Sequence, residues 1–301
     1  MKKYSIVIII NFLLLTYSQT SAQETAQPFF NMKGGIAVQT TQMDALADTI
    51  AVINHRSDDI VWSRIIYRVI DMREKQNYQL YFPLRANDEY KSLFRLMLNA
   101  IVDGIPVYRR NPREIKPSFN DKIVDTELPL IFAYDEEHRE YDLIQVDSVT
   151  HVIKIADDQY QQYIKSQIKF LIQEIVFFDK HYSRMFSKII AIAPMNSNNP
   201  SNSRSKISMD FFKQSILCWF SFNELRPYMA KQYVIPNGNE TQRLTFDEFF
   251  AQKYYSSYLL GDANLFNRTL LETYNDPEKI RKEQKRIETE LLNFELDLWE
   301  F

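Results

Sequence analysis

The sequence predicts an α+β fold with several amphipathic helices, a small antiparallel sheet or hairpin, and a helical C-terminus. Segments with apolar residues at helical spacing are interspersed with short apolar runs bounded by turn residues. Glycine is scarce: the chain has 5 in 301 residues, against a usual ~7%. Rossmann, P-loop and sandwich proteins use glycine in phosphate loops and tight turns, so this scarcity argues against those classes.

The charge balance excludes one class of partner. The chain carries 36 Lys and Arg residues against 39 Asp and Glu residues, a formal net charge of -3. Because a protein that neutralises phosphates needs a basic surplus, no nucleic-acid partner is expected.

The N-terminus has the layout of a secretory signal peptide, assigned to residues 1–22. Lys2 and Lys3 precede an apolar run, Tyr4–Tyr17, and small residues follow it. The expected cleavage lies between Ala22 and Gln23. The run is too short to cross a bilayer, which needs ~20 residues. No cysteine lies near the cleavage point, so the chain is not expected to be a lipoprotein, and we expect it to be periplasmic.

The mature chain is predicted to have three parts. Residues 23–42 are polar and without periodicity, and are expected to form a flexible N-terminal arm. Residues 43–274 are predicted to be the α+β core domain, and residues 275–301 a C-terminal amphipathic helix and tail.

The first half of the core is predicted to hold three helices, with a short extended segment between the second and third. One helix is expected near Met43–Ile53. A second begins at Asp58 as N-cap and continues to Gln76, because Val61, Ile65 and Val69 recur four residues apart. Leu80–Pro83 is expected to be extended because the residue before proline avoids the helical region. The third helix covers Leu93–Ile101, capped by Asp88 or a neighbour and stopped by Gly104.

The middle of the chain is predicted to form mainly strands. The expected strand segments are Val107–Tyr108, Leu130–Phe132, Leu143–Ile144, Ile168–Phe178, Met185–Pro194 and Phe211–Phe222. Asp179–Ser183 is expected to join two of them into a hairpin. A short helix is predicted at Asp157–Gln162.

Three helix starts are expected in the last third. A helix is predicted at Glu224–Lys231, and the residues Thr245 to Glu248 form a capping box ahead of a helix over Phe246–Leu260. Asp276 followed by Pro277 is typical of an N-cap and first helical residue, so the last helix is expected to begin there.

No constellation of catalytic, cofactor-binding or metal-ligating residues is predicted. None of the four histidines stands three or four residues from another, and Cys218, the single cysteine, lies in an apolar run. The chain has no GxSxG or GxxxxGK[ST] motif, and two S-x-x-K matches lack the partners of penicillin-recognising enzymes. The chain is therefore predicted not to be an enzyme, with Cys218 a buried thiol and no cofactor.

Aromatic residues supply the candidate interface or docking positions: Trp62, Tyr254, Tyr258, Trp299 and Phe301. Adjacent aromatic residues on one helix cannot all face the core, and Tyr and Trp are enriched at binding hot spots. Trp62 is either a core residue or an interface anchor. Trp299 and Phe301 dock either on this chain or on a neighbour.

Several stretches resemble one protein family. They are Val61–Ser63, Arg68–Gln76 and Leu80–Pro83, then Phe177–Lys180 and Ile189–Pro194, and finally Arg243–Phe250, Ser256–Tyr258 and Asn293–Phe301. In this order they resemble the GldN/PorN family, a periplasmic component of the type IX secretion and gliding-motility machinery of Bacteroidetes.

The resemblance implies a non-enzymatic scaffold role. It implies a periplasmic ring built with an outer-membrane lipoprotein of the GldK/PorK type, through which the chain is associated with the outer membrane. It also implies self-association within that ring and contact with the periplasmic part of the motor protein GldM/PorM. The alternative is a secreted hydrolase or glycan-binding protein that uses scattered carboxylates and exposed aromatic residues.

Overall fold

The computed structural model describes residues 49–50, 53, 55–85, 90–111, 114–132, 143–147, 149–166, 169–195, 215–236, 243–262, 270–274 and 276–297. The expected signal peptide, its cleavage site at Ala22 and Gln23, and the N-terminal arm lie outside these residues, as do Trp299 and Phe301. Most of the helix expected at Met43–Ile53 also lies outside them, and its described residues, Thr49, Ile50 and Ile53, are not helical.

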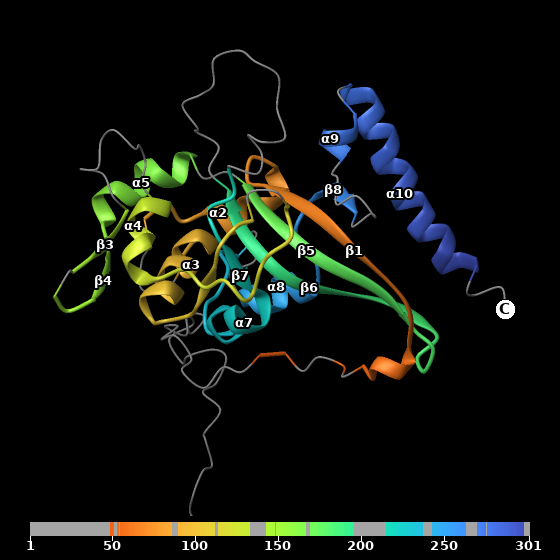
Figure 1. Cartoon of the computed structure of the whole chain (residues 1–301), viewed down its shortest axis with the longest axis horizontal. Helices are drawn as coiled ribbons and strands as arrows, with labels where there is room; N and C mark the ends of the chain where they lie inside the picture. The colour runs from red at the N-terminus through yellow and green to blue at the C-terminus, as the bar shows by residue number, and fades with distance from the viewer. Residues whose placement is uncertain are drawn as a thin grey trace, which may run out of the picture. The chain divides into compact units, whose positions relative to one another are not determined.

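Within this part of the chain, a six-stranded antiparallel sheet has the strand order β2-β7-β6-β5-β1-β8 (Figure 1). Its strands are β1 (Ile60–Asp71), β2 (Val107–Tyr108), β5 (Lys169–Asp179), β6 (Arg184–Met195), β7 (Trp219–Ser221) and β8 (Tyr258–Asp262). A separate two-stranded sheet pairs β3 (Ile144–Val146) with β4 (Ile153–Ile155). The long strands β1, β5 and β6 form the centre, so the predicted α+β class is confirmed.

The described helices are mostly short. They are η1 (Ser57–Asp59), η2 (Lys75–Asn77), α2 (Tyr78–Tyr81), α3 (Leu93–Val102), η3 (Asp125–Glu127), α4 (Leu128–Ile131), α5 (Asp157–Ser166), α7 (Phe222–Ala230), α8 (Phe246–Ala251), α9 (Leu270–Thr273) and α10 (Pro277–Asp297). The exception is α10, which covers 21 residues.

The sheet is apolar on both faces. Alternate residues of β1 point to opposite faces, so Ile66 and Ile70 share one face while Tyr67 and Val69 share the other. Ile70 belongs to the main core beneath α3, α7 and α8, whereas Ile66 packs with Ile287 of α10. One face is therefore covered by the core helices at one end of β1 and by α10 nearer the other end.

The opposite face carries a second core. It contains Tyr67 and Val69 of β1 together with Leu171, Ala191 and the fully buried Trp219. Strands that are buried on both faces read as near-continuous apolar runs, and this property explains the largest error of the sequence prediction.

The helix predicted from Asp58 to Gln76 is wrong: Ile60–Asp71 is the strand β1, which pairs with both β5 and β8. Asp58 lies in the 3-10 turn η1 instead of capping a helix. Apolar residues on both faces of a strand imitate the wide apolar stripe of a buried helix, and periodicity cannot separate the two. The abundance of β-branched residues in this segment was the available signal for a strand.

Several local predictions are confirmed. The helix α3 lies where the sequence predicts it, and Gly104 follows it with a φ of 89°. Its N-cap is Ser92, which accepts a hydrogen bond from the Arg95 N–H at 3.3 Å, whereas the predicted cap Asp88 lies outside the described residues. The hairpin of β5 and β6 has the predicted turn, since Asp179 pairs with Arg184. The helix predicted at Asp157 is α5, the helix at Glu224–Lys231 is α7, and the strands at Val107 and Ile144 are β2 and β3.

Other predicted boundaries are wrong. Tyr78–Tyr81 is helical, so only Phe82 of the expected extended segment precedes its proline in extended form. Leu128–Ile131 is the helix α4 and not a strand, because Pro129 stands in its first turn. Within the described part of Phe211–Phe222, strand pairing is limited to β7 and a bridge at Ile216, and Phe222 begins α7.

The helix predicted over Phe246–Leu260 is too long. It ends at Ala251, and Lys253 then adopts a φ of 54°, which breaks the helix. The strand β8 begins only at Tyr258, and it pairs with β1 at the edge of the sheet.

Candidate protein-interaction surface

The described candidate aromatic residues lie in three separate places. Trp62 lies near the start of β1, and Tyr258 pairs with Val69 of the same strand. The seven residue steps from Trp62 to Val69 span roughly 23 Å at ~3.3 Å per residue. Tyr254 lies in the connection between α8 and β8. The structure therefore does not bring these residues into one patch.

Trp62 is the aromatic contact between α10 and the sheet. Its ring stacks on Phe294 of α10, with centroids 4.6 Å apart and planes 30° apart. A cavity of about 210 Å³ lies beside the stack and is lined in part by Arg64, Glu290 and Leu291. Trp62 is half-buried. It is thus a docking residue for a segment of its own chain.

The helix α10 begins where the sequence predicts. Asp276 accepts a hydrogen bond from the Glu278 N–H at 3.0 Å, and Pro277 is the first helical residue. Along the helix only Ile287 is buried, while Ile280, Leu291 and Phe294 are partly buried. Most of the surface of α10 therefore remains exposed.

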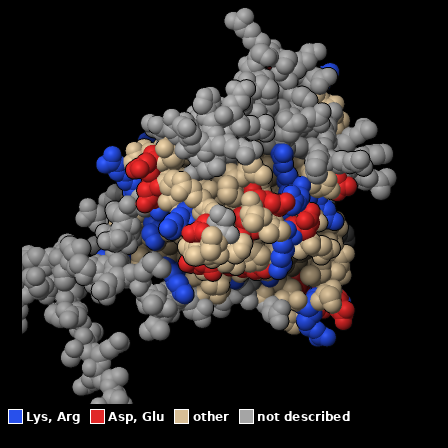
Figure 2. Space-filling view, turned by 60° about the vertical axis from the view of Figure 1, so that its left-hand side comes forward, with Lys and Arg blue, Asp and Glu red and all other residues tan. Residues whose placement is uncertain are grey.

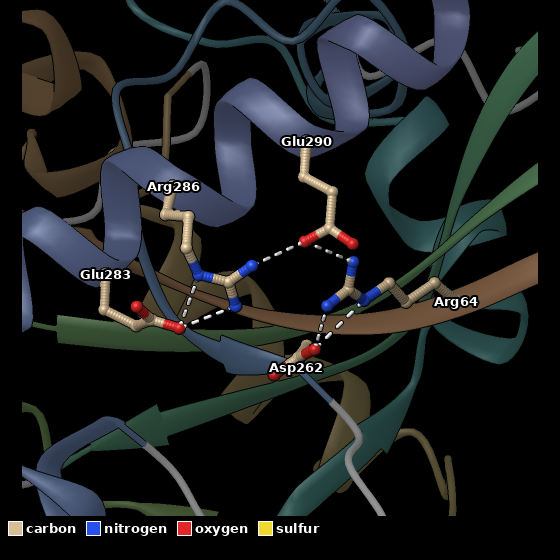
Figure 3. A network of polar contacts seen from close by, with 5 residues as sticks. All are labelled: Arg64, Asp262, Glu283, Arg286 and Glu290. Carbon is tan, nitrogen blue, oxygen red and sulfur yellow. Dashed lines mark hydrogen bonds and ion pairs between the residues drawn. The ribbon is translucent and has the colours of Figure 1, made fainter.

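Ion pairs add to the apolar contact that α10 makes through Ile287 and its partly buried neighbours (Figure 3). Arg64 of β1 donates to Asp262 of β8 through Nε, at 3.0 Å, and through Nη2. Its Nη1 lies 3.5 Å from Oε2 of Glu290, and the same oxygen accepts from Arg286 at 3.0 Å. Arg286 also donates to Glu283 at 2.7 Å. Glu290 thus bridges an arginine of the sheet and an arginine of its own helix.

The sequence prediction missed this network. Glu283, Arg286 and Glu290 follow the three- and four-residue spacing of neighbours on a helix, which was a visible signal. Hydrogen bonding to Glu283 raises the pKa of Arg286 further above its ordinary value. The pairing of Arg64 with Asp262 depends on the register of β1 and β8, which could not be read from spacing.

A second network crosses the same face of the sheet. The buried carboxylate of Glu174 lies 3.2 Å from Nε of Arg68 and also pairs with Lys253. Lys253 donates to the hydroxyl of Ser187 as well. A Ser–Lys pair can serve in nucleophilic catalysis when the lysine accepts a proton from the serine. Here Lys253 contacts the carboxylate of Glu174 as well as Ser187, so it links β5 to β6.

Among the histidines that the structure describes, His55 is paired with a carboxylate in an aromatic setting. Nδ1 of His55 lies 2.6 Å from Oδ2 of Asp179, and the imidazole is surrounded by Phe177, Tyr182 and Phe186. Burial works to raise the pKa of Asp179, but hydrogen bonds from His55 and the turn backbone outweigh it and lower that pKa. The pair fastens the segment before β1 to the hairpin turn.

The part of the chain that the structure describes offers neither a cluster of metal ligands nor an accessible thiol. There, no group of three or more His, Cys, Asp or Glu residues is arranged to hold a metal ion. The thiol of Cys218 is fully buried, as predicted, and burial raises its pKa well above the ordinary value. A thiol that is inaccessible and protonated is a poor nucleophile.

Exposed apolar side chains mark the outer side of α10. Leu292 is 55% exposed and Leu296 is 53% exposed, and their four-residue spacing places them on the same side of the helix. Elsewhere, on the face that Figure 2 shows, Lys and Arg side chains lie among Asp and Glu side chains. Such mixing does not favour a nucleic-acid partner, which needs a basic field. The outer side of α10 is our candidate protein-interaction surface.

The family comparison covers most of the chain. The model of the family described as "Gliding motility associated protein GldN" matches residues 55–300. The chain belongs to the GldN family. It is thus a component of the gliding-motility and type IX secretion machinery. No match was found among curated proteins.

The GldN match includes both the sheet and α10. It begins at His55, the residue that binds Asp179, and it extends past the last described residue of α10. The docking of α10 through Trp62 and Arg64 therefore lies within the GldN region. None of the helices in the described part of the chain is long and apolar enough to cross a membrane.

Proposed function

We propose that this GldN-family chain is a non-enzymatic periplasmic scaffold subunit of the secretion and gliding ring. In this proposal it assembles with an outer-membrane lipoprotein of the GldK/PorK type and packs against further copies of itself. It also contacts the periplasmic part of a GldM/PorM-type motor protein. The observation that supports a binding role best is the outer side of α10, where Leu292 and Leu296 stand exposed on a helix of 21 residues.

The way α10 is held suits a subunit that carries load between neighbours. Ion pairs of Arg64 and Arg68 reach α10 from β1, the central long strand that also pairs with β5 and β8. A partner that binds the outer side of α10 would thus be connected through these contacts to the sheet. Heterologous contacts between identical subunits close into a ring when the rotation between them allows it.

The hydrolase alternative lacks a supporting site. A carbohydrate-cleaving enzyme needs two carboxyl groups facing one cavity. The cavity beside Tyr254 has no Asp or Glu among its described lining residues. The groove along α10 has two carboxylates, Glu290 and Asp297, but Glu290 is already paired with Arg64 and Arg286.

Co-purification with the lipoprotein partner tests the proposal. The mature chain is co-expressed with a GldK/PorK-type lipoprotein, and the double change Leu292→Glu with Leu296→Glu is compared with wild type. We expect a roughly tenfold loss of partner yield with little change in melting temperature, because both side chains are exposed. Val149→Glu is the matched control, since Val149 is 87% exposed on the turn between β3 and β4.

Two results would contradict the proposal. One is a wild-type chain that stays a monodisperse monomer and shows no affinity for the lipoprotein. The other is turnover of a small molecule by the purified chain that is lost when one acidic or histidine side chain is changed.

A further inference from the structure

A cavity of about 340 Å³ lies away from the α10 surface and contains one of the sequence-predicted aromatic residues. Tyr254 lines it together with Gln76 of η2 and Gln79, which is in α2. The other described lining residues come from the segment after α7 and from Leu244, which precedes α8. This volume is at the lower end of ligand pockets, which hold ~300–1,000 Å³. It suits a ligand of one or two rings.

The frame of this cavity is held by hydrogen bonds. The Val234 N–H donates to the Leu244 carbonyl at 2.8 Å, and Gln79 Nε2 donates to the Ile235 carbonyl at 2.6 Å. Tyr254 donates its own N–H to the Phe249 carbonyl at 3.1 Å, and its ring meets the Phe249 ring edge-on at 6.2 Å. These contacts connect α2 to the segment after α7, and Tyr254 to α8, with no ligand present.

The lining combines amide groups, one phenol and aliphatic carbon. A primary amide offers two N–H donors and one carbonyl acceptor, and the bond from Gln79 to Ile235 uses only one of these three groups. Val234, Pro236 and Leu244 supply the apolar part of the wall. Tyr254 is 46% exposed, and an aromatic ring can take a flat apolar face against it.

The ligand chemistry follows from these groups. None of the described lining residues carries a charge, so the cavity favours a neutral ligand. Side-chain amides are complementary to an acetamido group, which both donates and accepts, and its methyl group fits the aliphatic wall. A pyranose ring has an apolar C–H face that stacks on an aromatic ring, and hydroxyl groups at its edge.

We propose that the cavity beside Tyr254 binds an N-acetylated amino sugar. The site goes beyond the scaffold function and uses none of the residues of the α10 surface. The same chemistry is found in a free sugar and in the glycan strands of a bacterial cell wall, and the test separates these sources.

Saturation-transfer NMR on the purified mature chain tests the site with N,N′-diacetylchitobiose, and cellobiose serves as the analogue without acetamido groups. We expect saturation transfer to diacetylchitobiose only. Tyr254→Ala should raise the Kd by roughly tenfold or more. Tyr182→Ala is the matched control because Tyr182 is 44% exposed at a different place, the hairpin turn. Gln76→Ala should weaken binding less, with an unchanged melting temperature.

Sedimentation with purified cell-wall sacculi separates the two sources. If the chain co-sediments with sacculi and Tyr254→Ala abolishes this, the ligand is the glycan strand of the cell wall. If the chain binds diacetylchitobiose but does not co-sediment, the ligand is a free sugar. Equal binding of cellobiose, no binding of either disaccharide, or unchanged binding by Tyr254→Ala would overturn the site. Binding of a proline-rich peptide in place of both sugars would do the same. None of these results bears on co-purification with the lipoprotein, so the two proposals fail separately.

Discussion

The helices α3 and α10 lie on the same face of the sheet but are held there by different forces. α3 buries seven of its ten residues in the main core. α10 buries only Ile287 of 21 residues, and ion pairs with Arg64 and Arg68 supplement that contact. Charge screening by salt does not weaken apolar burial, whereas it weakens exposed ion pairs. The comparison indicates that α3 maintains the fold, while α10 is a surface element that can respond to partners and ionic conditions.

The strongest test of this contrast is Phe94→Ala in α3. Phe94 is buried and stacks on Tyr163, with centroids 5.6 Å apart. Its truncation should lower the free energy of unfolding by about 3–5 kcal/mol, because a large cavity forms in the core. Urea unfolding followed by circular dichroism measures the effect. A loss below about 1 kcal/mol would show that α3 is not the stabilising element.

Ile287→Ala is the corresponding change in α10. Loss of this buried side chain should cost about 2–3 kcal/mol, and the cost should be local because few other apolar contacts hold the helix. Hydrogen exchange is expected to accelerate in α10 and to stay unchanged in α3. Equal acceleration in both helices would mean that α10 unfolds together with the core, and the contrast would be lost.

Trp62→Ala separates docking from core packing. Truncation of a fully buried tryptophan would lower the free energy of unfolding by about 3–5 kcal/mol. Trp62 is only half-buried and stacks on one ring, so we expect a smaller loss, about 1–2 kcal/mol. Phe294→Ala should give a similar loss, and the double variant should cost less than the sum of both. Additive losses would contradict the stacking contact.

Thr245→Ala measures a local interaction on the α3 side. Thr245 Oγ1 accepts from the Glu248 N–H at 3.2 Å, and Glu248 accepts from the Thr245 N–H at 2.8 Å. Losing this capping box should cost about 1 kcal/mol. Thr289→Ala is the control, because Thr289 lies exposed in the middle of α10. An equal melting temperature for Thr245→Ala and wild type would show that the cap contributes nothing.

Glu290→Gln should have the smallest effect. Glu290 pairs with Arg64 at 3.5 Å and with Arg286 at 3.0 Å, but it is half exposed, so we expect a loss of about 0.5 kcal/mol at low salt. The loss should disappear in 1 M NaCl, where the screening length falls to ~3 Å. Thermal melts at both salt concentrations measure it, and a salt-independent loss would point to packing instead of charge.

Local chemistry explains which elements were predictable. The capping box at Thr245, the Asp276–Pro277 start of α10 and the Asp179 turn are encoded within a few neighbouring residues. Of the candidate interface residues, Trp62 stacks on Phe294 of its own chain, a contact that was not foreseen, and binding of another protein by Trp62 stays a prediction. Trp299 and Phe301 lie outside the described residues, so their docking stays a prediction.

What could be read from this sequence was the α+β class, the caps of α8 and α10, the hairpin turn and the family. The caps and the turn follow from residues that are close together in the chain, and the family from several short stretches along it. The identity of β1 as a strand could not be read, because its apolar run satisfies a buried helix equally well until β5 and β8 pair with it. The contact of Arg64 with Asp262 and Glu290 required the same pairing. Long-range strand register, which brings distant side chains together, is a property of the folded sheet and not of local spacing.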